Sequence, residues 1–176
     1  MFNQLITKGI IPKKLIQIAG PPNSGKTTIL YNLCAHLSSE KKALIFDCEM
    51  KFSPERLIDV ISNKQRKVNL HNIVIIRLYN IKEQFRNIMS IHNYIHEGVF
   101  SFIAINGITD HFRSLNKSKR TFSLKRIFTM QLAYLKHLSS QMRIPVVFTN
   151  QIVETKTLEN KLIPVLNNTV SLYSDH

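Results

Sequence analysis

The sequence is short of cysteine, of acidic residues and of long apolar runs, and each shortage excludes a class of protein. Its two cysteines, Cys34 and Cys48, have neither metal-site nor redox-motif spacing, so we expect reduced thiols in a cytoplasmic protein. The longest apolar runs, such as Val99–Ile105, are strand-sized and too short to cross a membrane. The N-terminus shows no apolar stretch followed by a small-residue cleavage site, which argues against a secretory signal. We therefore expect no membrane partner.

Acidic residues are scarce relative to basic ones. Eleven Asp and Glu against 24 Lys and Arg leave a formal net charge of +13. Such an excess favours polyanionic partners, either nucleic acid or an anionic membrane surface. The stretch from His111 to Arg143 contains no acidic residue, and its basic residues are Arg113, Lys117, Lys119, Arg120, Lys125, Arg126, Lys136 and Arg143. This distribution favours nucleic acid, with an ordinary solvated helix face as the alternative.

Short apolar runs alternate with amphipathic helical patterns along the 176 residues, without repeats or a Gly/Ser-rich linker. Strands are predicted at Leu15–Ala19, Ala43–Asp47, Ile73–Leu78, Phe100–Ile105 and Val146–Thr149. Helices are predicted at 26–39, from Pro54 towards Lys64, at 81–97 and at 123–141. This alternation predicts one α/β domain spanning residues 1–176, with a mainly parallel sheet and helices on both faces. Beyond Gln151 the pattern is too weak to assign.

Residues 20–27 read GPPNSGKT and match the phosphate-binding loop G-x-x-x-x-G-K-[ST] in full. An apolar strand pattern leads into the match and a helical pattern leads out, as that loop requires. Glycines let backbone amides approach phosphate oxygens, and the following helix N-terminus adds partial positive charge. Lys26 should reach the β- and γ-phosphates, and the Thr27 hydroxyl should ligate Mg²⁺. The sequence therefore predicts a nucleoside triphosphate site.

Three further segments resemble RecA-class recombinases of archaea and eukaryotes, in the family's order. Residues 47–57 read DCEMKFSPERL and resemble D-T-E-G-x-F-x-P-E-R-L. Residues 103–113 are similar to the Walker B strand followed by D-S-I-T-x-x-x-R, and residues 144–151 read IPVVFTNQ, similar to I-P-V-V-x-T-N-Q. The resemblance implies a RecA-like P-loop core that binds ATP and Mg²⁺. The shortness of the chain is most similar to the RadB group of archaeal recombinase paralogues, and we expect a C-terminally abbreviated core.

The resemblance also implies roles for individual residues. Glu49 falls on the catalytic carboxylate that polarises the attacking water, and Gln151 on the residue that senses the γ-phosphate; Lys26 completes this catalytic set. The alternatives are a helix cap at Glu49 and an ordinary polar strand end at Gln151. Arg56 matches the arginine that stacks on adenine, with a surface salt bridge as its alternative. The implied nucleotide-binding residues are Gly20, Pro21, Pro22, Asn23, Ser24, Gly25, Lys26, Thr27, Thr28 and Arg56.

The Walker B aspartate of the family is replaced by Asn106. Asparagine has nearly the same shape but carries no charge, so it only partly replaces a carboxylate that binds Mg²⁺ through water. Loss of such a carboxylate typically costs about 10–100-fold in metal affinity or activity. We therefore expect metal contacts from Thr27 and, through water, Asn106, with ATP binding retained and hydrolysis weak or absent.

In the family, the loops after Walker B and after Asn-Gln face DNA. The first corresponds to about Arg113–Arg126, and the implied DNA-binding residues are Arg113, Lys117, Lys119, Arg120, Lys125 and Arg126. The second, about Ile152–Pro164, is nearly neutral. Single strands are the expected form of DNA, bound through phosphates. Phe112 and Phe122 could stack on bases or pack beneath the first loop.

Two hypotheses follow: a DNA-binding recombination and repair ATPase, or a non-hydrolysing, ATP-gated accessory module that binds a full-length recombinase. A small-molecule kinase is a third, which the segments 49–56 and 150–151 argue against. His92 and His96 have a helical i,i+4 spacing that could bind zinc, but without a third ligand a surface or partly buried pair is the favoured interpretation.

Overall fold

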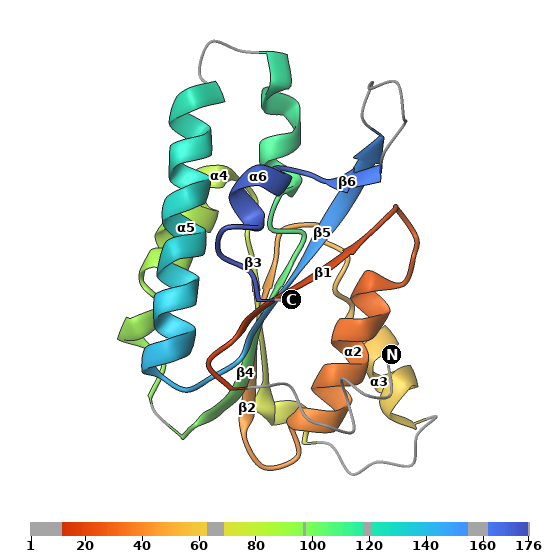
Figure 1. Ribbon diagram of the computed structural model, residues 1–176. Helices are drawn as coiled ribbons and strands as arrows, with labels where there is room; N and C mark the ends of the chain where they lie inside the picture. The colour runs from red at the N-terminus through yellow and green to blue at the C-terminus, as the bar shows by residue number, and fades with distance from the viewer. Residues whose placement is uncertain (1–11, 63–68, 97, 118–120, 155–161, 176) are drawn as a thin grey trace.

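The computed structural model describes residues 12–62, 69–96, 98–117, 121–154 and 162–175, with only the backbone described at the ends of some of these ranges. Strands and helices alternate along the chain (Figure 1). The strands are β1 (Leu15–Gly20), β2 (Lys42–Asp47), β3 (Ile73–Arg77), β4 (Phe100–Asn106), β5 (Val146–Glu154) and β6 (Leu162–Pro164). The α-helices are α2 (Lys26–Leu37), α3 (Pro54–Ser62), α4 (Ile81–Met89), α5 (Thr121–Gln141) and α6 (Asn167–Val170). The described residues also include the 3₁₀ segments η1 (Leu70–Asn72), η2 (Ile91–Asn93) and η3 (Asp110–Lys117).

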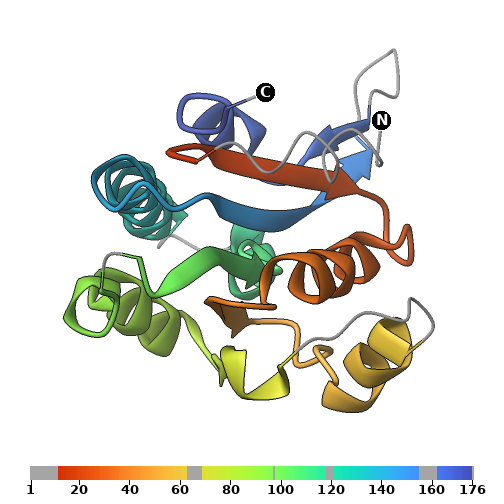
Figure 2. The same ribbon diagram turned by 90° about the horizontal axis from the view of Figure 1, so that it is seen from below.

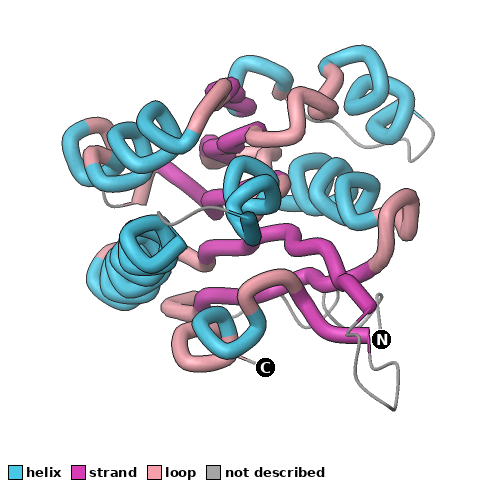
Figure 3. Tube along the Cα trace, turned by 90° about the horizontal axis from the view of Figure 1, so that it is seen from above, coloured by secondary structure: helices cyan, strands magenta, loops and turns pink. Residues whose placement is uncertain are grey.

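Five of the strands form a parallel sheet in the order β1-β5-β4-β2-β3, and β6 pairs antiparallel with β5. The five predicted strands and the parallel sheet are therefore confirmed. Their apolar runs are nearly continuous because helices cover both faces of the sheet. Figures 2 and 3 show α2 and α3 on one face and α4 and α5 on the other.

The side chains of β2 alternate between two cores. Leu44 and Phe46 belong to the cluster under α4 and α5, whereas Ala43 and Ile45 belong to the cluster under α2 and α3. All four are buried, as the period of two in a strand requires when both faces are covered. Cys34 and Cys48 are buried free thiols, one in each cluster, which confirms the expectation of unpaired cysteines.

The predicted helix at 81–97 is wrong in its length, because α4 ends at Met89 and a 3₁₀ segment follows. The Ser90 hydroxyl donates to the Arg86 carbonyl oxygen at 2.7 Å, and such local bonds compete with helix continuation. His92 therefore lies in η2 and His96 beyond it, so the two do not share a helix face. Among the described residues, no group of three His, Cys, Asp or Glu is placed to hold a metal ion.

The region after Gln151, left unassigned from the sequence, contains the end of β5, then β6 and α6. The expected loop at 152–164 thus begins and ends in paired strands, with Ile152 opposite Pro164 and Glu154 opposite Leu162. The residues between them, including Lys156, Glu159 and Lys161, lie outside the described residues. Within the part of the chain that is described, no helix has the length and apolar character needed to cross a lipid bilayer.

The register of the parallel strands brings their carboxyl ends together. Gly20 at the end of β1 lies opposite Gln151 in β5, and Asp47 at the end of β2 lies opposite Asn106 at the end of β4. In open parallel sheets this edge is where ligands bind.

Candidate nucleotide-binding site

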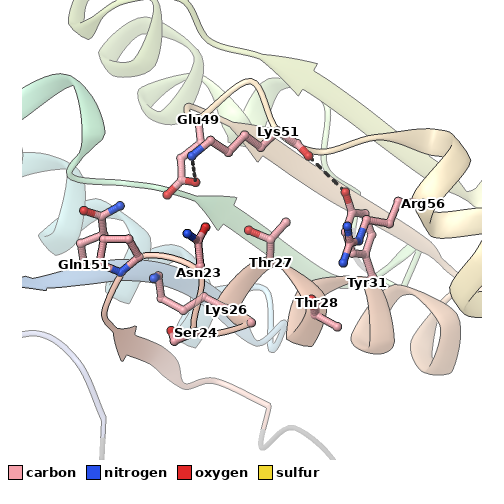
Figure 4. Close-up of a pocket in the computed structure, with 12 residues that line it drawn as sticks. Asn23, Ser24, Lys26, Thr27, Thr28, Tyr31, Glu49, Lys51, Arg56 and Gln151 are labelled. Carbon is pink, nitrogen blue, oxygen red and sulfur yellow. Dashed lines mark hydrogen bonds and ion pairs between the residues drawn. The ribbon is translucent and has the colours of Figure 1, made fainter.

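A cavity of about 320 Å³ lies at the carboxyl edge of the sheet. Three segments line it: the loop and first turns of α2, the segment after β2, and β5 (Figure 4). Its lining residues are Pro22, Asn23, Ser24, Gly25, Lys26, Thr27, Thr28, Tyr31, Glu49, Lys51, Arg56 and Gln151. The structure thus brings together nearly all of the predicted nucleotide-binding and catalytic residues, with Gly20 and Pro21 at the base of the same loop.

The loop between β1 and α2 has the tight backbone that glycine permits. Gly25 adopts φ 85° and is the N-cap residue of α2, so no side chain covers the amides of the first turn. A Cβ at Gly20 would lie 2.5 Å from the Ser24 hydroxyl oxygen. The open helix N-terminus presents amides and partial positive charge, which is suited to an anion.

Lys26, the first residue of α2, is buried against this loop, with a relative exposure of 8%. Its ammonium donates to the carbonyl oxygens of Gly20, at 3.0 Å, and Pro21, at 2.7 Å. Burial lowers the pKa of Lys26, while the negative charge of Glu49 opposes that shift. The ammonium is therefore held by the loop itself, where phosphate oxygens could replace the two carbonyl partners.

Asn106 joins three elements beneath the cavity. Its Oδ1 accepts from the Thr27 hydroxyl at 3.1 Å and from the Thr149 hydroxyl at 3.2 Å. Its Nδ2 donates to Oδ1 of Asp47 at 2.9 Å, and the other carboxylate oxygen of Asp47 accepts from the Phe52 amide at 2.8 Å. Asn106 and Asp47 are both fully buried. The Walker B position is thus occupied by a neutral side chain whose polar atoms are all paired.

Glu49 stands at the opposite wall, close to two cations. One carboxylate oxygen lies 3.8 Å from the Lys51 ammonium, and the other lies 4.0 Å from the Arg113 guanidinium. Arg113 also forms an ion pair with Asp110. Gly107 adopts φ 75°, and a Cβ there would lie 2.4 Å from Cγ of Glu49. The loop after β4 therefore holds Glu49 by both contact and charge.

Tyr31 and Arg56 form the far end of the cavity (Figure 4). The Tyr31 ring packs against Phe52 with centroids 4.5 Å apart. Its hydroxyl accepts from the Ser53 amide at 2.8 Å and donates to the Lys51 carbonyl at 3.2 Å. Burial raises the pKa of Tyr31, so the phenol stays protonated. Because Tyr31 is almost fully buried, the exposed Arg56 guanidinium is the planar group at this end that suits a base.

The predicted DNA-binding residues are spread over different environments. Lys125 and Arg126 are exposed on the first turns of α5, whereas Arg113 pairs with the carboxylates of Glu49 and Asp110. Lys119 and Arg120 lie outside the described residues, as does the side chain of Lys117. Phe112 is buried and packs on Phe128, with centroids 5.1 Å apart, which supports packing rather than base stacking. The side chain of Phe122 also lies outside the described part of the chain.

Sequence reasoning missed four residues of the site: Asp47, Tyr31, Lys51 and Thr149. Tyr31 lies one helical turn after Thr27, a spacing that places both on one face of α2. Asp47 ends a strand two residues before Glu49. The roles of Asp47 and Thr149 depend on which strands are neighbours, which the linear pattern does not state.

A parallel sheet with a G-x-x-x-x-G-K-T loop after β1, and with Glu49 just after β2, Asn106 at the end of β4 and Gln151 in β5, defines a RecA-class P-loop core. Residues 1–163 match the Rad51 family, and the chain belongs to that family. Over 154 residues it is 33% identical to the DNA repair and recombination protein RadB of Thermococcus sibiricus and 32% identical to that of Thermococcus kodakarensis. These matches cover 86% of this chain and 64% and 67% of the two relatives. A third RadB, from Thermococcus onnurineus, is 30% identical over 171 residues, covering 96% of this chain and 73% of the relative. The chain thus spans about two thirds of the length of the curated relatives that it matches.

Proposed function

We propose that this chain binds ATP in the cavity at the carboxyl edge of the sheet and acts on DNA in recombination and repair, with weak ATP hydrolysis. The cavity carries this proposal, because it combines an open helix N-terminus, a buried ammonium and a carboxylate in one space. The relatives named RadB support the biological role, since their names refer to DNA repair and recombination.

The triphosphate would lie along the loop, with its oxygens on the amides of the first turn of α2 and on the Lys26 ammonium. Lys26 already donates to two loop carbonyls, so binding exchanges these partners for charged ones, which form stronger hydrogen bonds. The base would lie towards Tyr31 and Arg56. Gln151 lines the same cavity from β5 and would contact the terminal phosphate.

Weak hydrolysis follows from two features of the site. Glu49, which would polarise the attacking water, lies close to the cations of Lys51 and Arg113, and these cations compete with that water for its carboxylate oxygens. Asn106 contributes no charge beside Thr27. A catalytic carboxylate normally contributes about 10²–10⁴-fold to rate, so its restraint slows turnover without removing ATP binding.

The second candidate is a non-hydrolysing module that binds ATP and assists a full-length recombinase. The paired, neutral Asn106 favours it. Phosphate release with and without single-stranded DNA separates the two candidates. Turnover that disappears in Glu49→Ala supports the enzyme, whereas firm ATP binding without turnover supports the module.

Lys26→Ala tests the ATP site directly. Calorimetric titration with ATP should show binding to the unmodified chain and its loss in Lys26→Ala. Lys41→Ala is the matched control, because Lys41 is exposed at the opposite end of the sheet. Equal ATP affinity in both variants would refute the proposed site.

DNA would bind through phosphates along the start of α5. Lys125 and Arg126 are exposed there, and such contacts give affinity that falls steeply with salt. The double reversal Lys125→Glu with Arg126→Glu should abolish most single-strand binding. Lys41→Glu with Lys42→Glu changes the net charge equally at the amino end of β2 and should retain most of it. If the two doubles lose affinity equally, α5 is not the DNA surface.

A further inference from the structure

The side chain that replaces the Walker B carboxylate has a fixed orientation. Asn106 directs its oxygen towards the hydroxyls of Thr27 and Thr149 and its amide nitrogen towards Asp47. A reversed amide would place NH₂ against two hydroxyls and an oxygen against a carboxylate, so this network selects one arrangement. The group that faces Thr27 is therefore a neutral carbonyl oxygen.

The residues around Thr27 do not fit a tightly held Mg²⁺ ion. Magnesium prefers charged oxygen ligands, and near this hydroxyl the protein offers a neutral amide oxygen. Both oxygens of Asp47 already accept hydrogen bonds, from Asn106 and from the Phe52 amide. Glu49 lies beside the cations of Lys51 and Arg113. Both carboxylates are engaged with these partners, and the Thr27 hydroxyl donates to Asn106 instead of to either of them.

The cavity instead carries surplus positive charge. Among its charged lining residues, Lys26, Lys51 and Arg56 are cationic and Glu49 is anionic. Arg113 lies 4.0 Å from Glu49 and offsets part of the negative charge among these lining residues. A triphosphate entering this space meets cations and helix amides without a metal between them.

We propose that this site binds a nucleoside triphosphate without Mg²⁺ about as tightly as it binds the Mg²⁺ complex; this inference rests on the proposed ATP site. A carboxylate beside Thr27 would repel the phosphates unless a divalent cation lay between them. The neutral Asn106 removes that repulsion. The cations of Lys26, Lys51 and Arg56 supply the attraction that the metal otherwise provides.

Calorimetric titration of the full chain with ATP, in excess Mg²⁺ and in EDTA, tests the inference. The two dissociation constants should agree within about threefold, a small difference on the scale of affinities. A larger loss in EDTA overturns the inference while leaving the ATP site intact. If ATP binds under neither condition although the chain is folded, the proposed ATP site fails and the inference fails with it.

Two variants show whether the residue at 106 is responsible. Asn106→Asp places a second carboxylate against Asp47, which threatens folding. The exchange Asp47→Asn with Asn106→Asp avoids this, because the amide introduced at position 47 can still accept from the Phe52 N–H and donate to position 106. In the exchanged variant EDTA should weaken ATP binding by more than about tenfold, in the range typical for carboxylates near a metal. If the exchanged variant remains as indifferent to EDTA as the parent, the neutral side chain is not the cause and the proposal is overturned.

Discussion

Asn106 donates a hydrogen bond of 2.9 Å to the carboxylate of Asp47, joining the ends of β4 and β2 beneath the nucleotide cavity. Both side chains are fully buried, so each depends on the other for one of its hydrogen bonds.

Asp47→Ala should destabilise the chain strongly, because it leaves the Asn106 amide and the Phe52 N–H without acceptors. Each unsatisfied buried donor costs about 1–3 kcal/mol, so we expect a loss of about 3 kcal/mol in the free energy of unfolding, measured in urea. Asp59→Ala, at an exposed position on α3, should change it by less than about 0.5 kcal/mol. Similar losses in the two variants would contradict a structural role for the pair.

Gly107→Ala should cost more stability than Gly98→Ala. Both glycines have left-handed φ angles, 75° and 80°, so both variants carry a backbone cost of about 1–2 kcal/mol. Only at Gly107 would the new Cβ also meet Glu49, 2.4 Å from its Cγ, whereas nothing lies within 4 Å at Gly98. The difference in urea unfolding between the two variants therefore isolates the contact with Glu49. Equal losses would show that Glu49 moves aside without cost.

Arg113→Ala should weaken single-strand binding less than Lys125→Ala does. Both side chains are exposed, but Arg113 is already paired with Glu49 and Asp110, which offset its charge. We expect the affinity for single strands to fall by about twofold or less in Arg113→Ala and by more in Lys125→Ala. Only Lys125→Ala should reduce the slope of log affinity against log salt concentration. Fluorescence anisotropy with a labelled oligonucleotide at several salt concentrations measures both. A steeper loss for Arg113→Ala would place it on the DNA surface.

Asp175 should make the stability of the fold depend on acid pH. Burial alone would raise its pKa, but hydrogen bonds from Lys136, the Leu15 amide and Lys14 outweigh burial and lower it. A carboxyl group with a lowered folded pKa stabilises fully above its unfolded pKa of about 3.9, and the contribution is lost as pH falls through the folded value. Unfolding free energies measured between about pH 6 and pH 2 should therefore fall more steeply in the parent than in Asp175→Asn. Parallel curves would contradict this role.

The strands and the phosphate-binding loop were predictable because their signals are local. A buried strand such as β2 is a continuous apolar run, and the loop is a fixed spacing of glycine, lysine and threonine. The end of α4 was not predictable from periodicity, which carries no sign of the Ser90 hydroxyl bond to Arg86 or of the 3₁₀ segment that follows. The apolar pattern continues past Met89 although the helix does not.

The network around Asn106 could not be derived from the sequence, because it depends on strand order. Asp47 and Asn106 are far apart in the chain and become neighbours only since β2 pairs with β4. Arg113 likewise appears in the sequence as one member of a basic stretch. Its partner Glu49 becomes evident only when the loop after β4 is folded against the segment after β2, whereas Asp110 is a local partner three residues earlier in η3.

The strand β5 changes its partner at the cavity. Gln151 lies opposite Gly20 of β1, and the next residue, Ile152, lies opposite Pro164 of β6. One continuous strand therefore carries a cavity residue on one side of this junction and a two-stranded ribbon on the other. The backbone that holds Gln151 beside β1 is therefore continuous with the ribbon, whose last paired residue of β5, Glu154, lies about 10 Å further along the strand.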